Sequence, residues 1–138
     1  MYKKLYEQIN YSFKNEDILD LVFTLKSSGE NNNERLEFLG DAILGAVISE
    51  ELYNRFTNIN EGELTRIRAS LVRGTTLMKK GKELELLSLA KLSKAAKNLS
   101  DLENSSILGT IFEALVGGIY LDSSWAVSYT HLTLPTKA

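Results

Sequence analysis

Apolar residues recur at three- and four-residue steps along most of this chain, and that period constrains the fold more than any other feature of the sequence. Residues spaced in this way lie on one face of an α-helix, whereas a half-buried strand alternates polar and apolar residues. The clearest stretch runs from Glu34 to Phe56, with Leu36, Ile43 and Val47 on its core-facing stripe. No hairpin turn with alternating flanks occurs, so the sequence predicts an all-α fold.

Shorter amphipathic stretches lie on both sides of this helix. We expect helices at 3–9, 16–25, 75–84 and 105–121, and a further one that begins after the N-cap residue Asn60. The polar segment 27–33 is expected to be a loop, and 91–104 is left open between helix and loop.

The composition fits a single compact domain. The chain has 138 residues, of which 43% are hydrophobic, and this is enough to bury a core. Its longest apolar runs, such as Ala42–Ser49, are too short to cross a bilayer, and no signal segment follows Met1, so no membrane partner is expected. The absence of cysteine excludes disulfides and thiolate metal sites, and the cytoplasm is the default compartment.

The net charge of −2 and the isoelectric point near 5.5 bear on nucleic-acid binding. Proteins that bind nucleic acid tightly and without specificity are usually basic, because neutralising phosphates releases counterions. The charge therefore argues mildly against tight RNA binding by this domain alone. It leaves open a locally basic face, or a cleft whose acidic centre is neutralised by a metal ion.

The C-terminal residues differ in style from the rest of the chain. Ser128–Ala138 contains the only proline and the only histidine, and threonine alternates with leucine there as it would in a strand. We therefore predict one domain at 1–125 and a non-native or disordered tail at 126–138. A native, flexible C-terminus is the alternative.

Three acids lie on one narrow arc of the strongest helix. Glu34, Glu37 and Asp41 are spaced by three and four residues, which keeps them within about 60° of one face. Gly45 continues the arc one turn later and leaves open space there. Like charges at this spacing repel each other, unless a divalent cation with oxygen ligands, such as Mg2+, lies over them. An ordinary solvated acidic face is the alternative.

A second acid-bearing helix is expected at 105–121. It is apolar almost all round and should be buried, yet it carries the formal charge of Glu113. A buried charge needs a partner or a metal, because burying it unpaired is expensive. A salt bridge from an arginine such as Arg35 or Arg66 is the alternative. Gly117 and its neighbour would permit close helix packing.

The residues of these helices resemble a known family. The stretch NERLEFLGDAIL at 33–44 resembles, nearly letter for letter, the signature helix of the ribonuclease III family. Residues 61–72 are similar to the acidic-turn helix of that family, and 106–122 to its last conserved catalytic helix. The resemblance extends over 3–125, nearly a whole catalytic domain.

This resemblance implies a ribonuclease III-type helical endonuclease domain and an activity. The enzyme would hydrolyse double-stranded RNA with metal-activated water and leave 5′-phosphate and 3′-hydroxyl ends. By the resemblance, Glu37, Asp41 and Glu113 would bind Mg2+, with Mn2+ as an alternative cation, and no organic cofactor is implied. Glu34 and Glu61 would be further acids of the cleft that handle RNA or a second cation.

The resemblance also implies partners. Members of the family act as homodimers in which each site cuts one strand, and Phe38 would be an interface residue, with core packing as the alternative. Basic residues offer candidate contacts to the phosphates of the A-form duplex: Arg66, Arg68, Arg73, Lys79, Lys80 and Lys82. Surface charges without an RNA role are the alternative.

Three features depart from the family pattern. Thr110 stands where the family usually has a metal-binding aspartate, three residues before Glu113, so a neutral hydroxyl replaces an anionic ligand. The run 24–27 differs from the family's usual threonine-histidine-arginine-serine. The last helix is expected to end near Trp125, with no double-stranded-RNA-binding domain after it. We therefore expect an endoribonuclease of impaired activity, or else a catalytically silent relative that binds RNA or acts as a scaffold.

Overall fold

The computed structural model describes residues 2–90 and 106–132, and side chains as far as Ser123. The stretch 91–104, left open between helix and loop, lies outside the described residues. So does the end of the predicted tail, at 133–138.

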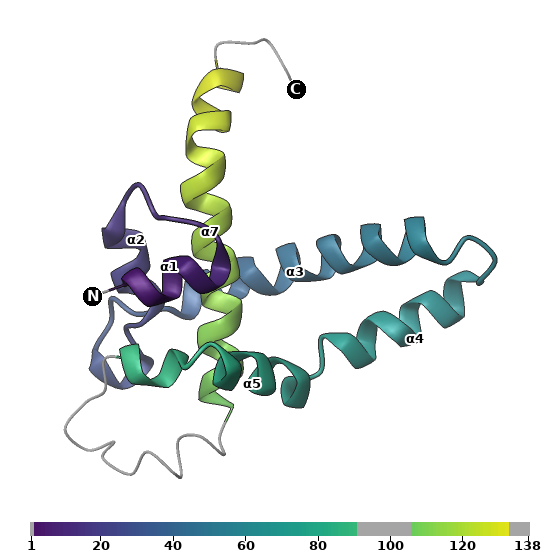
Figure 1. Ribbon diagram of the computed structural model, residues 1–138, viewed down its shortest axis with the longest axis horizontal. Coiled ribbons are helices and arrows are strands. Elements are labelled where there is room, and N and C mark those ends of the chain that lie inside the picture. Colours follow the sequence, from purple (N-terminus) through teal and green to yellow (C-terminus); the bar gives the residue numbers. More distant parts are fainter. Residues whose placement is uncertain (1, 91–105, 133–138) are drawn as a thin grey trace.

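The described part of the chain is helical and contains no β-strand, which confirms the all-α prediction (Figure 1). No helix in this part is both long and apolar enough to span a membrane. The helices, with two short 3-10 turns, are α1 (Lys3–Ile9), α2 (Glu16–Val22), η1 (Lys26–Ser28), α3 (Glu34–Arg55), α4 (Glu61–Leu71), α5 (Gly74–Glu83), η2 (Leu86–Leu89) and α7 (Ile107–Leu132).

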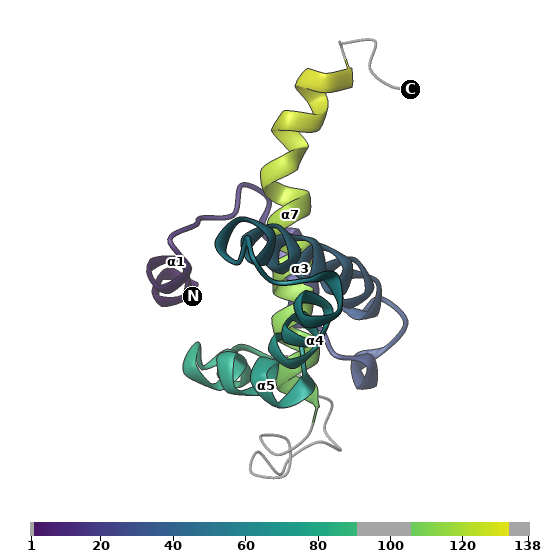
Figure 2. The ribbon, with the colours of Figure 1, turned by 90° about the vertical axis from the view of Figure 1, so that its right-hand side faces the viewer.

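Helix α7 is the centre of the molecule. Helices α2, α3 and α5 pack against it, with α3 crossing one side and α5 lying near its beginning (Figures 1 and 2). Apolar side chains of α1, α2, α3, the core-facing side of α7 and the segments between them form one buried cluster. Its largest fully buried side chains are those of Leu19, Val22, Phe23, Leu86, Leu108, Ile111 and Leu115.

Helices α3 and α4 form a hairpin arm that leaves the body of the molecule (Figure 1). The N-terminal half of α3 packs on α7 and buries Leu36, as the apolar stripe predicts. Val47, farther along the same stripe, is 60% exposed. The prediction was wrong at this position because the C-terminal half of α3 extends past the core, where α4 is the one described helix beside it. Asn60 caps α4 as expected, since its side chain accepts a hydrogen bond from the Glu63 N–H at 2.9 Å.

The contact between α3 and α7 is made backbone to backbone. A Cβ atom at Gly40 would lie 1.7 Å from the carbonyl oxygen of Glu113, and one at Gly117 would lie 2.4 Å from that of Leu36. Only glycine permits this approach, because any side chain would collide with main-chain atoms. The acid-bearing turns of the two helices are therefore held directly against each other.

Two helix ends differ from the sequence-based expectation. Helix α2 ends at Val22, and η1 follows at Lys26–Ser28 where a loop was expected. Helix α7 continues to Leu132, past the expected end near Trp125, and the strand-like interpretation of the tail is wrong as far as this residue. The first residue that must break a helix is Pro135, so the helix can extend this far despite its threonines. The domain boundary at 125/126 stays a prediction.

Candidate metal centre between helices α3 and α7

Four of the predicted site residues meet where α3 crosses α7. Glu37 and Asp41 lie one turn apart on α3, and Thr110 and Glu113 lie one turn apart on α7. The contact at Gly40 sets the spacing between the two helices. Glu37 thereby faces Thr110, and Asp41 faces Glu113.

The carboxyl group of Asp41 lies next to that of Glu113, close enough to act on the pKa of Glu113. Burial raises the pKa of Glu113, the neighbouring Asp41 raises it further and Glu37 adds to the effect, so that it reaches about 8. Ionisation of the Glu113 carboxyl is therefore disfavoured, because two adjacent carboxylates do not both ionise readily without a counter-charge. A cation between them would supply that counter-charge.

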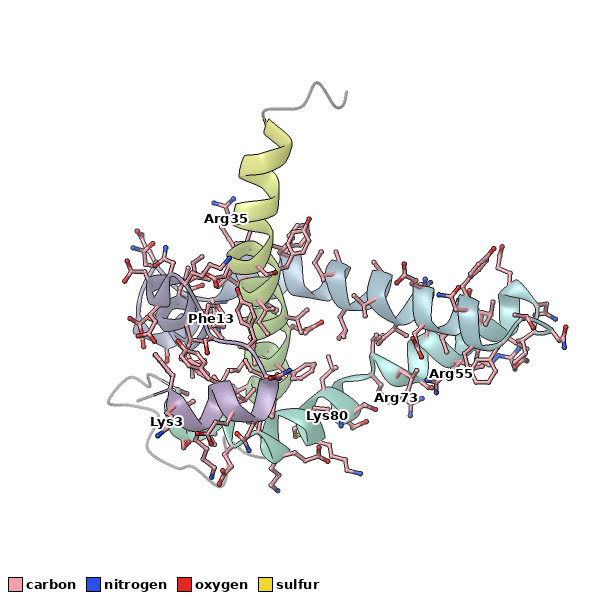
Figure 3. The ribbon with its side chains drawn as sticks, turned by 45° about the horizontal axis from the view of Figure 1, so that its top comes forward. Lys3, Phe13, Arg35, Arg55, Arg73 and Lys80 are labelled. Atoms are coloured by element: carbon pink, nitrogen blue, oxygen red, sulfur yellow. The ribbon has the colours of Figure 1, made fainter. Side chains whose placement is uncertain are left out.

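The predicted alternative, an arginine paired with Glu113, is wrong within the described residues. Arg66 forms its ion pair with Glu63 at 2.9 Å, one turn away on α4. Arg35 projects from the outer side of the α3–α7 crossing (Figure 3), and no salt bridge from it to Glu113 is present in the part of the chain described. The charged groups next to the Glu113 carboxyl are therefore acids and not a base among the described residues.

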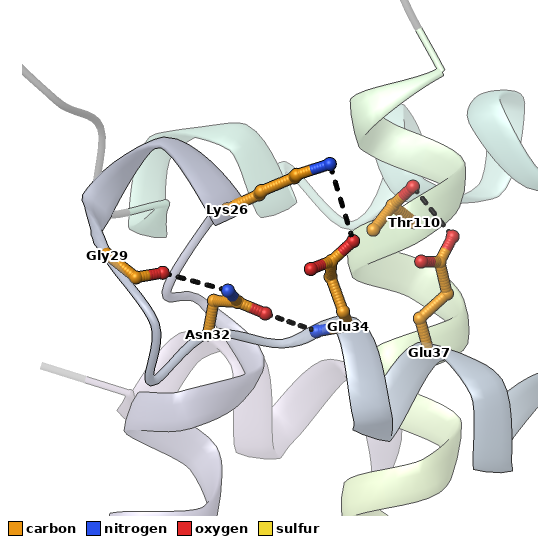
Figure 4. A network of polar contacts seen from close by, with 6 residues as sticks. All are labelled: Lys26, Gly29, Asn32, Glu34, Glu37 and Thr110. Atoms are coloured by element: carbon orange, nitrogen blue, oxygen red, sulfur yellow. Dashed lines mark hydrogen bonds and ion pairs between the residues drawn. The ribbon is translucent and has the colours of Figure 1, made fainter.

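The Thr110 hydroxyl donates a hydrogen bond to Oε2 of Glu37 at 2.9 Å (Figure 4). Thr110 lies in the first turn of α7, where its amide N–H bonds to the carbonyl oxygen of Ser106 at 3.0 Å. Its side chain is therefore directed across the gap between the helices toward α3. The structure identifies Thr110 as a hydrogen-bond donor to an acid, and its role as a metal ligand stays a prediction.

Glu34 lies beside this group, at the start of α3. Its carboxylate is 3.9 Å from the ammonium of Lys26, and its amide N–H donates to the Asn32 side chain at 2.9 Å (Figure 4). Glu34, Glu37 and Thr110 line one cavity of about 620 Å3, which Lys26 also borders. The structure therefore brings Glu34 close to the candidate metal centre, with its charge partly offset by a lysine.

Glu61 is not brought to the other acids within this chain. It begins α4, at the far end of the hairpin arm (Figure 1). There it lines a small cavity of about 200 Å3 with Tyr53 and Arg68. Phe38, by contrast, lies beside the acids on α3 and is 80% exposed. Its predicted alternative, core packing, is therefore wrong, and its side chain is open to a partner.

Some of the basic residues that were predicted to contact RNA phosphates already bind other side chains of the chain. Besides the pair of Arg66 with Glu63, Arg68 donates to the Ser49 hydroxyl at 2.8 Å, and Lys80 lies 3.4 Å from Glu83. Arg73 and Lys80 are exposed along the α4–α5 edge of the molecule (Figure 3). This edge supplies positive charge at the surface near the arm.

Donor chemistry at the crossing fits a divalent cation. Mg2+ is usually bound by one or two carboxylates, with waters and substrate phosphates completing the octahedron. Asp41 and Glu113 offer two such carboxylates, and Glu37 lies close enough to influence the pKa of Glu113. No group of three acid, histidine or cysteine side chains among the described residues is arranged as a ready metal cage. The residues thus fit a cation site whose third acid is engaged by Thr110.

Asp122 is a buried acid that the sequence did not single out. It is 2% exposed and accepts hydrogen bonds from the Tyr11 hydroxyl at 2.5 Å and from the amides of Lys14 and Asn15 at 2.8 and 2.9 Å. Burial opposes ionisation, but the bonds from Tyr11 and the two amides outweigh it and hold the pKa of Asp122 below its ordinary value. Asp122 fastens the connection between α1 and α2 onto α7.

Known proteins share this sequence and fold. A family model described as Ribonuclease-III-like matches residues 12–133. Ribonuclease 3 of Vibrio vulnificus strain YJ016 is 44% identical over 125 residues, which cover 91% of this chain and 56% of that protein. Ribonuclease 3 of Marinomonas sp. strain MWYL1 is 43% identical over 132 residues, covering 96% and 58%. The chain therefore spans somewhat more than half the length of these relatives.

Solved structures show the same likeness. The nuclease domain of ribonuclease III from Campylobacter jejuni, in a study of structural flexibility in a region involved in dimer formation, superposes with a TM-score of 0.85 at 34% identity, covering 99% of this chain and 100% of that one. Dicer from Pichia stipitis gives 0.64 at 26% identity, covering 87% of this chain and 51% of that one. The matched residues include the whole of α3 and the α7 crossing, and the chain belongs to the ribonuclease III family.

Proposed function

We propose that this domain is an endoribonuclease that hydrolyses double-stranded RNA with a divalent cation held between α3 and α7. One observation carries the proposal: Asp41 and Glu113, from two separate helices, bring their carboxyl groups into contact, with Glu37 beside them. Family membership supports the reaction class. Mg2+ is the proposed cation, with Mn2+ as a substitute, and the products would have 5′-phosphate and 3′-hydroxyl ends. The cytoplasm is the expected compartment.

The chain's own residues have distinct roles in this proposal. Asp41 and Glu113 would hold the cation directly, both as carboxylates. Glu37 would complete the anionic side of the site. A bound cation supplies a nucleophile from water at neutral pH and positive charge that stabilises the transition state. No side chain needs to act as a nucleophile.

RNA and a second copy of the chain are the proposed partners. Arg73 and Lys79, both exposed near the arm, would contact phosphates, which suits recognition of the duplex by shape. Phe38 and Tyr53 of α3 are 80% and 74% exposed, which supports a homodimer that covers this helix. Glu61 remains a candidate for handling RNA or a second cation from its place on the arm.

A catalytically silent relative that binds structured RNA is the second candidate, and Thr110 favours it. A threonine in place of an acid removes one negative charge from the site, which would lower the affinity for Mg2+. Such a protein would bind duplex RNA without cutting it.

Cleavage of a long RNA duplex in increasing Mg2+ separates the two candidates. We expect cleavage by the parent, a loss of at least about 100-fold in Glu113→Gln, and a gain in Thr110→Asp, because the aspartate restores an anionic ligand. Glu51→Gln, which removes an acid from the exposed end of α3, is the matched control and should cut as the parent does. Duplex binding without cleavage at any Mg2+ concentration would identify the silent relative. Full activity in Glu113→Gln would refute the ligand assignment.

A further inference from the structure

We propose that Thr110 is a positioning residue, which orients the Glu37 carboxylate for the cation and is not itself a ligand. This inference rests on the proposed function and deepens it. The sequence suggested that a hydroxyl had replaced a metal-binding acid and left a weaker ligand. The geometry points to a different use of the same hydroxyl.

The direction of the Thr110 hydroxyl bond is unusual for a helix. Serine and threonine in or beside helices commonly donate to the main-chain carbonyl four residues earlier. Thr24 and Ser49 of this chain do so, at 2.8 and 2.7 Å. Thr110 instead donates across to Oε2 of Glu37 at 2.9 Å. A hydrogen bond to an ionised acceptor is stronger than one to a carbonyl, so the carboxylate determines where this proton points.

A threonine hydroxyl has one proton and two lone pairs, and at this site the proton is donated to Glu37. The lone pairs are not used in that bond, so direct ligation of the cation is the alternative to positioning. Thr110 is half-buried and branched at Cβ, so its side chain has few rotamers in the helix and holds its bond in one direction. One carboxylate oxygen of Glu37 is thereby fixed, and the other does not take part in that bond.

The two facing pairs at the crossing are therefore different. Asp41 and Glu113 are two acids that face each other across the crossing, with no neutral donor between them. Glu37 has a neutral donor opposite it and keeps its orientation without a cation. The hydroxyl at Thr110 removes one like-charge contact and pre-orders one oxygen ligand. Groups that orient a metal ligand through a hydrogen bond typically change the metal affinity 10–100-fold.

Metal affinity, measured by calorimetric titration of Mn2+ and Mg2+, tests this role without relying on activity. We expect Thr110→Ser, which keeps the hydroxyl, to bind like the parent. Thr110→Val, which keeps the shape and loses the hydroxyl, should bind about tenfold more weakly. Thr75→Val makes the same chemical change at an exposed position of α5 and should leave the affinity unchanged.

A double-mutant cycle with Glu37→Ala, which removes the acceptor oxygen altogether, distinguishes positioning from direct ligation. If Thr110 acts through Glu37, the Thr110→Val change should have no further effect once residue 37 is an alanine. An equal tenfold loss in both backgrounds would make Thr110 a ligand in its own right and overturn the inference. Parent-like affinity in Thr110→Val, while the parent binds metal, would also overturn it but leave the proposed function intact. Absence of metal binding by the parent and by Thr110→Asp would refute both.

Discussion

Helix α7 carries two acids whose carboxyl groups behave in opposite ways. The pKa of Glu113 is raised to about 8 by burial and by the acids of α3, whereas the pKa of Asp122 is lowered by the hydroxyl of Tyr11 and two main-chain amides. Burial raises the pKa of both carboxyl groups, so burial alone does not decide the direction. The groups that each carboxyl faces decide it.

This difference separates an acid that holds the fold together from one that is held ready for a ligand. Around Asp122 the hydrogen bonds are complete within the chain, and its charge contributes to stability. Around Glu113 the chain supplies further negative charge and no base among the described residues. Clusters of acids that depress one another's ionisation are typical of functional sites, where a cation completes the arrangement.

The largest effect is expected from Gly40→Ala, which would separate the Glu113 region from α3 and leave the Asp122 region untouched. The added methyl would lie 1.7 Å from a main-chain oxygen, and no side-chain movement can relieve that contact. We expect the free energy of unfolding to fall by more than about 3 kcal/mol, measured by urea denaturation.

Gly45→Ala is the matched control for that variant. It lies on the same helix, but an added Cβ meets nothing within 4 Å. Replacing glycine by alanine inside a helix should stabilise it by up to about 1 kcal/mol. Equal losses of stability in the two variants would contradict the close crossing of α3 and α7.

Asp122→Ala should have the next largest effect, and on stability alone. It leaves the amides of Lys14 and Asn15 without their buried acceptor, so we expect a loss of about 2–3 kcal/mol by thermal or urea unfolding. Tyr11→Phe, which removes one of the three bonds, should lose less. Folded Asp122→Ala should bind Mn2+ with the affinity of the parent. Loss of metal binding in the folded variant would remove the distinction between the two acids.

Glu113→Gln should keep its stability and lose metal binding, the opposite of Asp122→Ala. The glutamine amide can donate to Asp41 as the protonated acid does, so the stability of the metal-free protein should change by less than about 1 kcal/mol. The increase in melting temperature on adding Mn2+ should disappear, since the site has lost a ligand. A variant that still responds to Mn2+ like the parent would show that the cation lies elsewhere.

The smallest effects concern pH, and their signs differ for the two acids. The folded-state pKa of Glu113 lies near 8, above its ordinary value of 4.5, so its stabilising contribution in chelator is complete below about 4.5 and is lost as the pH rises through 8. The pKa of Asp122 lies below its ordinary value of 3.8, so its contribution is present above that value and is lost as the pH falls through the folded-state pKa.

Melting temperature as a function of pH, in chelator, measures both contributions. Between pH 5 and 8, the melting temperature should fall less in Glu113→Gln than in the parent. At acidic pH, the melting temperature should fall less in Asp122→Asn than in the parent. The same slopes in parent and variants would contradict the opposite environments of the two carboxyl groups.

Features that depend on local sequence were predicted well. The helices follow from apolar periodicity, and the cap at Asn60 follows from side-chain chemistry within one turn. The shared arc of Glu37 and Asp41 is likewise a property of a single helix. That Glu113 should join them was implied by resemblance, and the contact itself depends on glycines of α3 and α7 that lie far apart in the sequence.

Features that depend on tertiary arrangement were missed. The exposure of Val47 arises because half of α3 leaves the core, which the periodicity of one helix cannot reveal. The bond from Thr110 to Glu37 requires the register of two helices to be known. Asp122 gave one signal, an acid at the end of an apolar helical stretch, but its donors come from the loop after α1. Spacing along one element does not locate such partners.

The most direct test of the central claim is an anomalous diffraction experiment on crystals that contain Mn2+. We predict a manganese peak within bonding distance of the Asp41 and Glu113 carboxylates, with Glu37 beside it and the Thr110 hydroxyl still bonded to Glu37. Manganese bound elsewhere, with the Asp41 and Glu113 carboxyl groups still in direct contact, would contradict the claim that two helices provide the ligands of one cation.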